Sequence, residues 1–189
     1  DQAAIDAGLA SQARAMTLLK NADEILPVDP EKKVYVENLD KSLASQFAQV
    51  VDTPEQADLA ILRLSTTWYP VATDIPMAQS FHHGDLDFKG EEKAQILRLL
   101  HQVPTIVVIA MDRPAVIPDI NAAAQALLVD FGASDEAVLR VVFGSAQPEG
   151  RLPFELPVAM EAVRAQKPDL PYDSENPVYP FGYGLSYPK

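Results

Sequence analysis

The sequence contains no cysteine among its 189 residues. Disulfide bonds, thiolate metal sites and a cysteine nucleophile are therefore excluded. A chain without disulfides is compatible with the cytoplasm, the periplasm or secretion, so the sequence leaves the compartment open.

Basic residues and long apolar runs are also scarce. Lys and Arg number 15 against 27 Asp and Glu, which gives a formal net charge of −12. Such a surface repels phosphate backbones and anionic membranes, so we expect no nucleic-acid partner. Because no apolar run approaches the roughly 20 residues of a membrane-spanning helix, we expect a soluble protein without membrane insertion.

Two enzyme motifs are missing as well. The segment between the first expected strand and the first helix behind it reads ENLDKSL and has no glycine, so it forms no phosphate-binding loop. No G-x-S-x-G motif marks a serine nucleophile. We therefore expect neither a bound nucleotide cofactor nor a serine-hydrolase triad.

Strand and helix patterns alternate along the chain. Residues 1–20 predict an amphipathic helix that docks on the domain, and the stretch Leu59–Leu64 is apolar on both faces apart from Arg63, as in a buried parallel strand. Further strands are expected at 34–36, 105–110, 127–131 and 151–156, and helices at 40–50, 89–101, 121–126 and 134–143. This alternation predicts an α/β fold: a mostly parallel sheet with helices on both faces, a flavodoxin-like α/β sandwich.

A long loop and an unusual C-terminal tail stand outside this pattern. Residues 65–88 show no clean period and leave the carboxyl end of a strand, where ligands meet such sheets. The tail NPVYPFGYGLSY carries three Tyr, one Phe, two Pro and two Gly, which disfavours a helix or a long strand. A loop of this length inside a compact domain is usually functional or mobile, and we expect the tail to form neither a helix nor a long strand.

Five segments, in order, resemble the C-terminal domain of glycoside hydrolase family 3, a family of many bacterial β-glucosidases. They are TLLKN, ADLAIL, FGASDEAVLRVVFG, PEGRLPFELP and YPFGYGLSY, and together they span nearly the whole chain. The resemblance implies that a (β/α)8-type barrel carrying the nucleophilic aspartate precedes this domain, in the same polypeptide or as a cleaved chain. We therefore assign residues 1–26 to a helix that connects to the barrel and residues 27–189 to the α/β sandwich with its C-terminal extension. The resemblance also implies that the aromatic tail packs against the sandwich.

The resemblance also implies the chemistry, which is hydrolysis of β-glucosides or related β-linked sugars with retention of configuration. In many members the general acid is a glutamate of this second domain, placed after the strand that matches Leu59–Leu64. Others keep a His–Asp pair in the barrel. Here the sequence reads LSTTWYP and has no Glu at that place. Because the barrel holds the nucleophile, the isolated domain is expected to be inactive.

The segment FHHGDLDF holds the candidate site residues. Asp85 could be the acid or bind a sugar hydroxyl, and His82, His83 and Asp87 could bind substrate. Two His and two Asp could also ligate zinc, but neighbouring His side chains point in different directions, so we expect no metal. The same residues could equally form a solvated loop tip, with Gly84 permitting a tight turn.

Other loop residues leave two interpretations open. Trp68 and Tyr69 could stack on a sugar ring, or they could fill the core or an interface. Asp112 and Arg113 follow the strongest strand, and we favour a structural ion pair over contact with substrate. Glu91 and Glu92 are expected in the first turn of a helix, where the helix dipole accounts for their charge.

The alternative to an active-site role is a non-catalytic one. The missing glutamate fits a domain that only supports the barrel, forms a homodimer interface or binds sugar without cleaving it. Loop deletions would then change stability or assembly and leave the chemistry intact.

Overall fold

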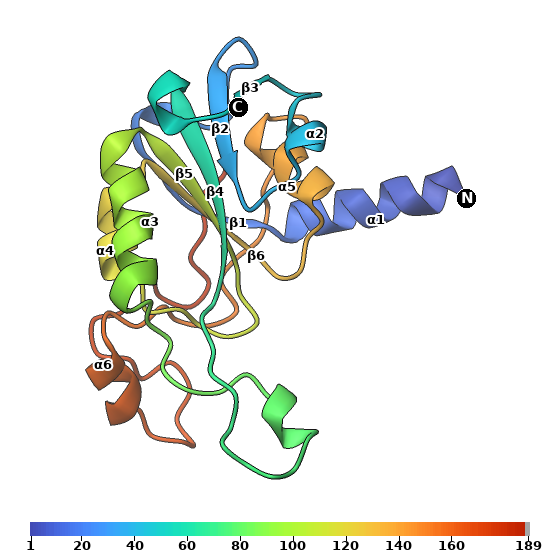
Figure 1. Cartoon of the computed structure of the whole chain (residues 1–189). Coiled ribbons are helices and arrows are strands. Elements are labelled where there is room, and N and C mark those ends of the chain that lie inside the picture. The colour runs from blue at the N-terminus through green and yellow to red at the C-terminus, as the bar shows by residue number, and fades with distance from the viewer. Residues whose placement is uncertain (188–189) are drawn as a thin grey trace.

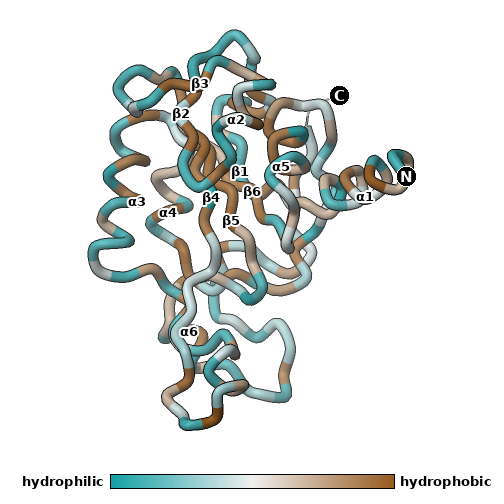
Figure 2. Tube along the Cα trace, turned by 45° about the vertical axis from the view of Figure 1, so that its right-hand side comes forward, coloured by the Kyte–Doolittle hydropathy of each residue, from teal (hydrophilic) through white to brown (hydrophobic). Residues whose placement is uncertain are grey.

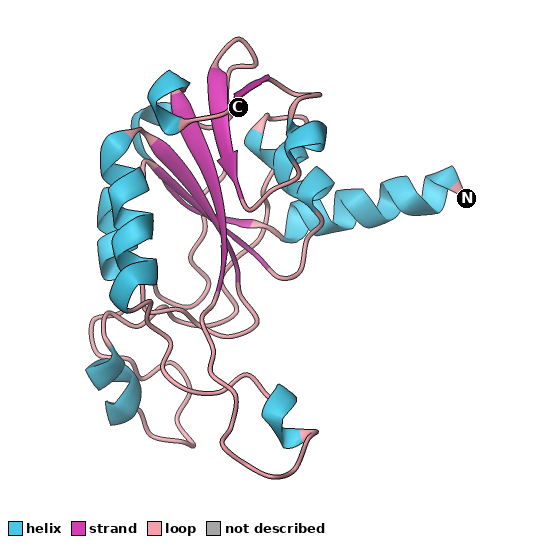
Figure 3. Ribbon diagram, in the orientation of Figure 1, coloured by secondary structure: helices cyan, strands magenta, loops and turns pink. Residues whose placement is uncertain are grey.

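A six-stranded sheet between two helical layers forms the body of the protein, in a computed structural model that describes residues 1–187 (Figures 1 and 3). The strands lie in the order β1-β6-β5-β4-β2-β3. Their bounds are Thr17–Asn21, Lys33–Glu37, Gln49–Val51, Leu59–Ser65, Thr105–Ala110 and Ala126–Asp130 for β1 to β6. The helices α1 to α6 span Gln2–Ala15, Lys41–Ala44, Gly90–Gln102, Pro118–Ala123, Asp135–Val142 and Met160–Ala165.

The sheet has flavodoxin-like topology with one added strand. Strands β2 to β6 pair in parallel, and numbered among themselves they have the order 2-1-3-4-5. Strand β1 adds antiparallel to the outer edge of β6, with an irregular register between Leu18 and Lys20. The predicted fold class is therefore confirmed.

Each face of the sheet has its own apolar core. On one face α3 and α4 cover side chains such as Leu62, Val107 and Leu127, and on the other α5 and α2 cover Ile61, Val108 and Leu128. Alternate residues of β4, β5 and β6 thus point to opposite cores, as the period of a strand requires. Figure 2 shows this as hydrophobic strands inside amphipathic helices.

Several expected elements differ from those observed. The first helix ends at Ala15, and residues 17–21 form strand β1, because the apolar run TLLKN pairs with β6. The helix expected over 40–50 is the single turn α2, and β3 follows it. The strand expected over 151–156 is absent; the segment makes only the isolated bridge Leu156–Tyr179. Helix α6 was not predicted.

Other expectations are confirmed. Strand β5 has the predicted bounds, and the Ser134 side chain accepts a hydrogen bond from the amide of Ala137 at the start of α5. Glu91 and Glu92 lie in the first turn of α3. Among the described helices, none is both long and apolar enough to cross a membrane.

The C-terminal tail packs against both cores, as predicted. Tyr179 joins the α3/α4 side and donates a hydrogen bond to Asn121 Oδ1 at 2.6 Å. Tyr187 joins the opposite side and donates to the carbonyl of Val141 at 2.7 Å. Between them the amide of Leu185 donates to the carbonyl of Leu18 in β1. The aromatic residues therefore fasten an irregular segment around the β1 edge of the sheet.

Candidate functional site

The carboxyl edge of the sheet is hollowed where the strand order reverses. Chain connections diverge between β2 and β4, the topological switch point at which α/β sheets bind ligands. A hollow of about 670 Å³ lies there, and a second of about 350 Å³ adjoins it across Ser65, Thr66, Trp68 and Ala110. These two hollows form the candidate site.

An ion network lies beside the first hollow, which its central residue, Arg63, lines. Arg63, the charged residue of β4, contacts Asp135 and lies 3.2 Å from Asp130. It also donates a hydrogen bond to the carbonyl of Ala133 at 2.6 Å. Asp130 is fully buried and accepts the amides of Gly132 and Ala133, each at 2.9 Å. The network fixes the β6–α5 turn beside the site.

Arg113 holds the two arms of the long loop together. Its guanidinium donates to the carbonyls of Thr67 on the outgoing arm and of His83, Gly84 and Asp85 on the returning arm, at 2.5–3.2 Å. The expected Asp112–Arg113 ion pair does not form, and this interpretation was wrong. Arg113 is structural, but its partners are backbone carbonyls.

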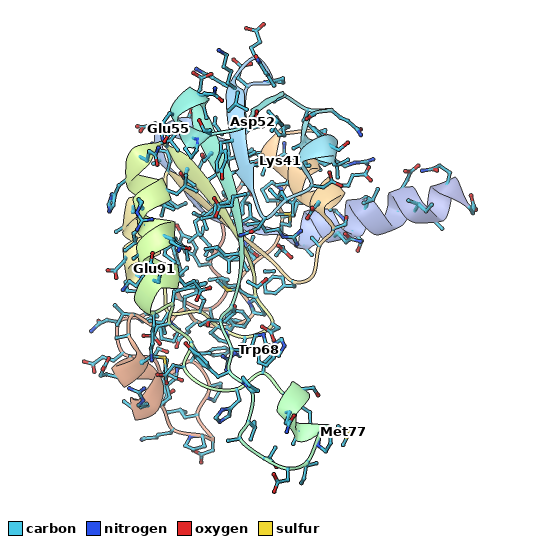
Figure 4. The ribbon with its side chains drawn as sticks, in the orientation of Figure 1. Lys41, Asp52, Glu55, Trp68, Met77 and Glu91 are labelled. Atoms are coloured by element: carbon cyan, nitrogen blue, oxygen red, sulfur yellow. The ribbon has the colours of Figure 1, made fainter. Side chains whose placement is uncertain are left out.

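The arms also meet through Tyr69. Its amide donates to the carbonyl of His83 at 2.7 Å. Gly84 has φ +88°, and a Cβ there would lie 2.6 Å from Tyr69 Cδ2, so the predicted tight turn does require glycine. Beyond this contact the loop extends away from the sheet, with Trp68 near its base and Met77 at its outer end (Figure 4).

His82 joins Trp68 and Asp112 at the second hollow. The imidazole stacks on the indole with ring centroids 4.5 Å apart and planes 11° apart. Its Nδ1 contacts Asp112 Oδ2. All three side chains line the hollow and stay accessible, at 42%, 42% and 49% for Trp68, His82 and Asp112. The sequence indicated His82 and Trp68 but missed Asp112 as their partner.

The two Asp of FHHGDLDF lie elsewhere. Asp85 and Asp87 line a third hollow of about 280 Å³, between α3, α4 and α6. Asp85 contacts Lys89 and lies 2.9 Å from the Arg164 guanidinium, and Asp87 lies 3.4 Å from Lys89. The candidate residues of FHHGDLDF are therefore divided between two hollows, with Lys89 beside both carboxylates and Arg164 of α6 beside Asp85.

Electrostatics at Asp85 favour the ionised form. The hydrogen bond from Lys89 is the main reason that the pKa of Asp85 is lowered, with the charge of Lys89 and the Arg164 contact adding to it. In turn Asp85 raises the pKa of Lys89. A general acid needs the opposite shift, toward a proton held near neutral pH. Within the described residues no three His, Asp or Glu side chains gather in a way that would hold a metal ion.

These features define a flavodoxin-like α/β domain with an accessible hollow at the switch point of its sheet. Comparison with known proteins gives its family. Residues 34–187 match the model of the glycosyl hydrolase family 3 C-terminal domain, and the chain belongs to this family.

Several similar proteins carry glycosidase names. The chain is 43% identical, over 97% of its length, to "Beta-glucosidase C" of Emericella nidulans and covers 30% of that protein. It is 37% identical to the "Periplasmic beta-glucosidase/beta-xylosidase" of Dickeya chrysanthemi over 94% of the chain and 27% of that protein. The chain thus spans less than a third of the length of these relatives.

Solved structures show the same fold. The β-glucosidase of Chaetomella raphigera superposes with a TM-score of 0.76 at 17% identity, over 98% of this chain and 36% of that one. The Bifidobacterium adolescentis enzyme superposes with a TM-score of 0.75 at 20% identity, over 99% and 37%.

Proposed function

We propose that this chain is the C-terminal domain of a retaining glycosidase that acts on β-glucosides or related β-linked sugars. The observation that carries the proposal is the 43–44% identity, over nearly the whole chain, to relatives named β-glucosidases. The hollow at the sheet's switch point supplies a surface that could face a sugar.

The reaction indicates how the catalytic groups are divided between the barrel and this domain. Retaining hydrolysis needs a nucleophilic carboxylate and a proton donor, typically two carboxyl groups about 5–5.5 Å apart. By family resemblance the nucleophile belongs to a preceding (β/α)8-type barrel, and this domain covers the barrel's active site. Helix α1, which projects from the sheet in Figure 1, is the proposed connection to the barrel. Because residues 17–21 form strand β1 of the sheet, the proposed connector covers residues 2–15 and not residues 1–26.

The loop of residues 66–88 is the proposed cover. Trp68 and Tyr69 are both more than 40% exposed and present aromatic faces of the kind that stack on sugar rings. At the outer end Ile75, Met77 and Phe81 are at least 60% exposed. Apolar side chains so exposed fit burial against another surface, here the barrel. His82, His83 and Asp87 remain proposed sugar contacts.

The experiment compares the full-length protein with the 189-residue chain on aryl β-glucosides and β-xylosides. The full-length protein should release the β-anomer first, as seen by NMR during early turnover, and the isolated chain should be inactive. Release of the α-anomer first, or hydrolysis by the isolated chain, would contradict the proposal. Replacing Asp85 by Asn in the full-length protein tests the sequence-based acid: a strong loss of rate supports it, and an unchanged rate removes it.

A non-catalytic role is the second candidate, favoured by the missing glutamate after β4. The domain would then support the barrel, bind sugar or form a dimer through the apolar loop end. Deleting residues 72–80 from the full-length protein separates the two functions. Lost assembly with unchanged turnover of a small aryl glucoside would favour the supporting role.

Location is proposed from one relative. Because the Dickeya chrysanthemi protein is named periplasmic, we propose a periplasmic or secreted location here too. Fractionation of the source cells checks this, and recovery in the cytoplasm alone would contradict it.

A further inference from the structure

The candidate site holds one acid–base pair that the frame of the domain does not use. Asp85 is paired with Lys89 and Arg164, and Arg63 is paired with Asp130 and Asp135. His82 and Asp112 contact each other instead, at an accessible hollow. Their remaining polar atoms are therefore available to a ligand.

Three separate segments build this pair. Asp112 follows β5, Trp68 follows β4, and His82 returns on the far arm of the loop. The indole fixes the plane of the imidazole, and Asp112 occupies Nδ1. With Nδ1 oriented by a carboxylate, Nε2 is the nitrogen left to exchange a proton with substrate, the arrangement that orients a catalytic histidine in hydrolytic triads.

We propose that His82 is the proton donor and acceptor of the glycosidase reaction and that Asp112 is its positioning residue. The inference rests on the proposed function and names the group that replaces the missing glutamate. The pair lies at the carboxyl edge of the sheet and lines the second hollow together with Trp68. Because the imidazole covers one face of the indole, a sugar bound in this hollow would lie beside the edge of the stacked rings, next to His82.

The proposed reaction has two steps, and the carboxylate of the barrel is the nucleophile in the first. As the carboxylate oxygen bonds to the anomeric carbon, the glycosidic C–O bond breaks and the His82 imidazolium gives its Nε2 proton to the leaving oxygen. Neutral His82 then takes a proton from water. The water oxygen bonds to the anomeric carbon, the carboxylate leaves, and the imidazolium is restored.

The test uses the full-length protein and substrates that need the proton to different degrees. His82→Ala should lower kcat/KM for an alkyl β-glucoside by about 10²–10⁴-fold, the usual contribution of acid–base catalysis. With 2,4-dinitrophenyl β-glucoside, whose leaving group needs no proton, the loss in kcat/KM should be far smaller. Azide should raise turnover of this variant and yield β-glucosyl azide. Asp112→Asn should show the same pattern with a smaller loss.

The matched control is His101→Ala, which removes an exposed histidine from the last turn of α3, at the opposite edge of the sheet. It should behave as wild type on both substrates. Equal activity of His82→Ala and wild type would overturn the inference, and so would equal losses on both substrates without azide rescue, which indicate a structural role. A wild-type protein inactive on all β-glycosides would overturn the proposed function and the inference with it.

Discussion

Replacing Arg63 by Met should destabilise the 189-residue chain by about 3–5 kcal/mol, the range for breaking a buried ion pair by removing one partner. The structure gives the reason. Asp130 has no exposed surface, and Arg63 is only 15% exposed. The substitution keeps the apolar stem of the side chain, so the loss reports on charge. It also removes the hydrogen bond to the Ala133 carbonyl.

Urea unfolding followed by far-UV circular dichroism measures this effect. With a slope near 2 kcal/mol per molar urea, the expected loss lowers the midpoint by roughly 1.5–2.5 M. Arg98→Met is the control, because Arg98 lies 3.6 Å from Glu91 and both side chains are at least 67% exposed. Exposed pairs of this kind contribute about 0–1 kcal/mol.

A double variant isolates the buried charge. Asp130→Asn keeps an Oδ1 oxygen to accept the amides of Gly132 and Ala133 and removes the charge. Adding it to Arg63→Met should make the pair of changes less harmful than the sum of the single ones, with an interaction energy of about 0.5–3 kcal/mol. Strict additivity, or a loss for Arg63→Met as small as that of the control, would refute the argument.

Three further predictions concern packing and pH. Gly150→Ala should lower the free energy of unfolding by about 1–3 kcal/mol or more, since the new Cβ would lie 2.3 Å from the Ala15 carbonyl oxygen. Gly8→Ala is the control: no atom lies within 4 Å of its Cβ, and it should stabilise α1 by about 0.5–1 kcal/mol. Tyr187→Ala should lower the urea midpoint by an amount equivalent to about 3–5 kcal/mol, and Phe181→Ala, at a half-exposed position, by little. Burial raises the pKa of Tyr179 to about 12 and also raises the pKa of Tyr187. Above pH 10 the phenols of the unfolded chain therefore lose their protons before those of the folded chain. The free energy of unfolding should then fall by up to about 1.4 kcal/mol per pH unit for each phenol. Tyr179→Phe should flatten this slope, and a stability independent of pH between 9 and 11 would contradict it.

The parts of the fold that were predicted correctly are those in which local pattern and burial agree. Strand β5 is apolar after Thr105 and central in the sheet, and Ser134 caps α5 through its own side chain. Strand β1 was missed because its helix-compatible residues gain more by pairing with β6, a contact more than 100 residues away in sequence. The segment 151–156 has strand-like residues, but it meets the tail only at isolated points, through backbone hydrogen bonds of Leu152 and the β-bridge of Leu156.

The sequence indicated which segment lies at the candidate site but not which side chains contact each other there. The loop and its residues Trp68 and His82 could be found because aromatic and acid–base side chains follow a buried strand. Their partner could not, since Asp112 is 30 residues from His82 and adjacent to an arginine that offered an obvious ion pair. Asp85 and Asp87 show the reverse: they adjoin the histidines in sequence but line another hollow, where Lys89 lies beside both and Arg164 beside Asp85.

Strand β5 explains how a long loop can present a positioned imidazole. The two residues that follow Met111, at its end, act on the same loop in different ways. Arg113 holds carbonyls on both arms, and Asp112 contacts the histidine that one arm carries. Since both residues follow closely on a buried, central strand, their backbone is held in place, and their contacts position the loop. On the proposed mechanism, a proton donor delivered in this way makes a glutamate after β4 unnecessary, which accounts for its absence from LSTTWYP.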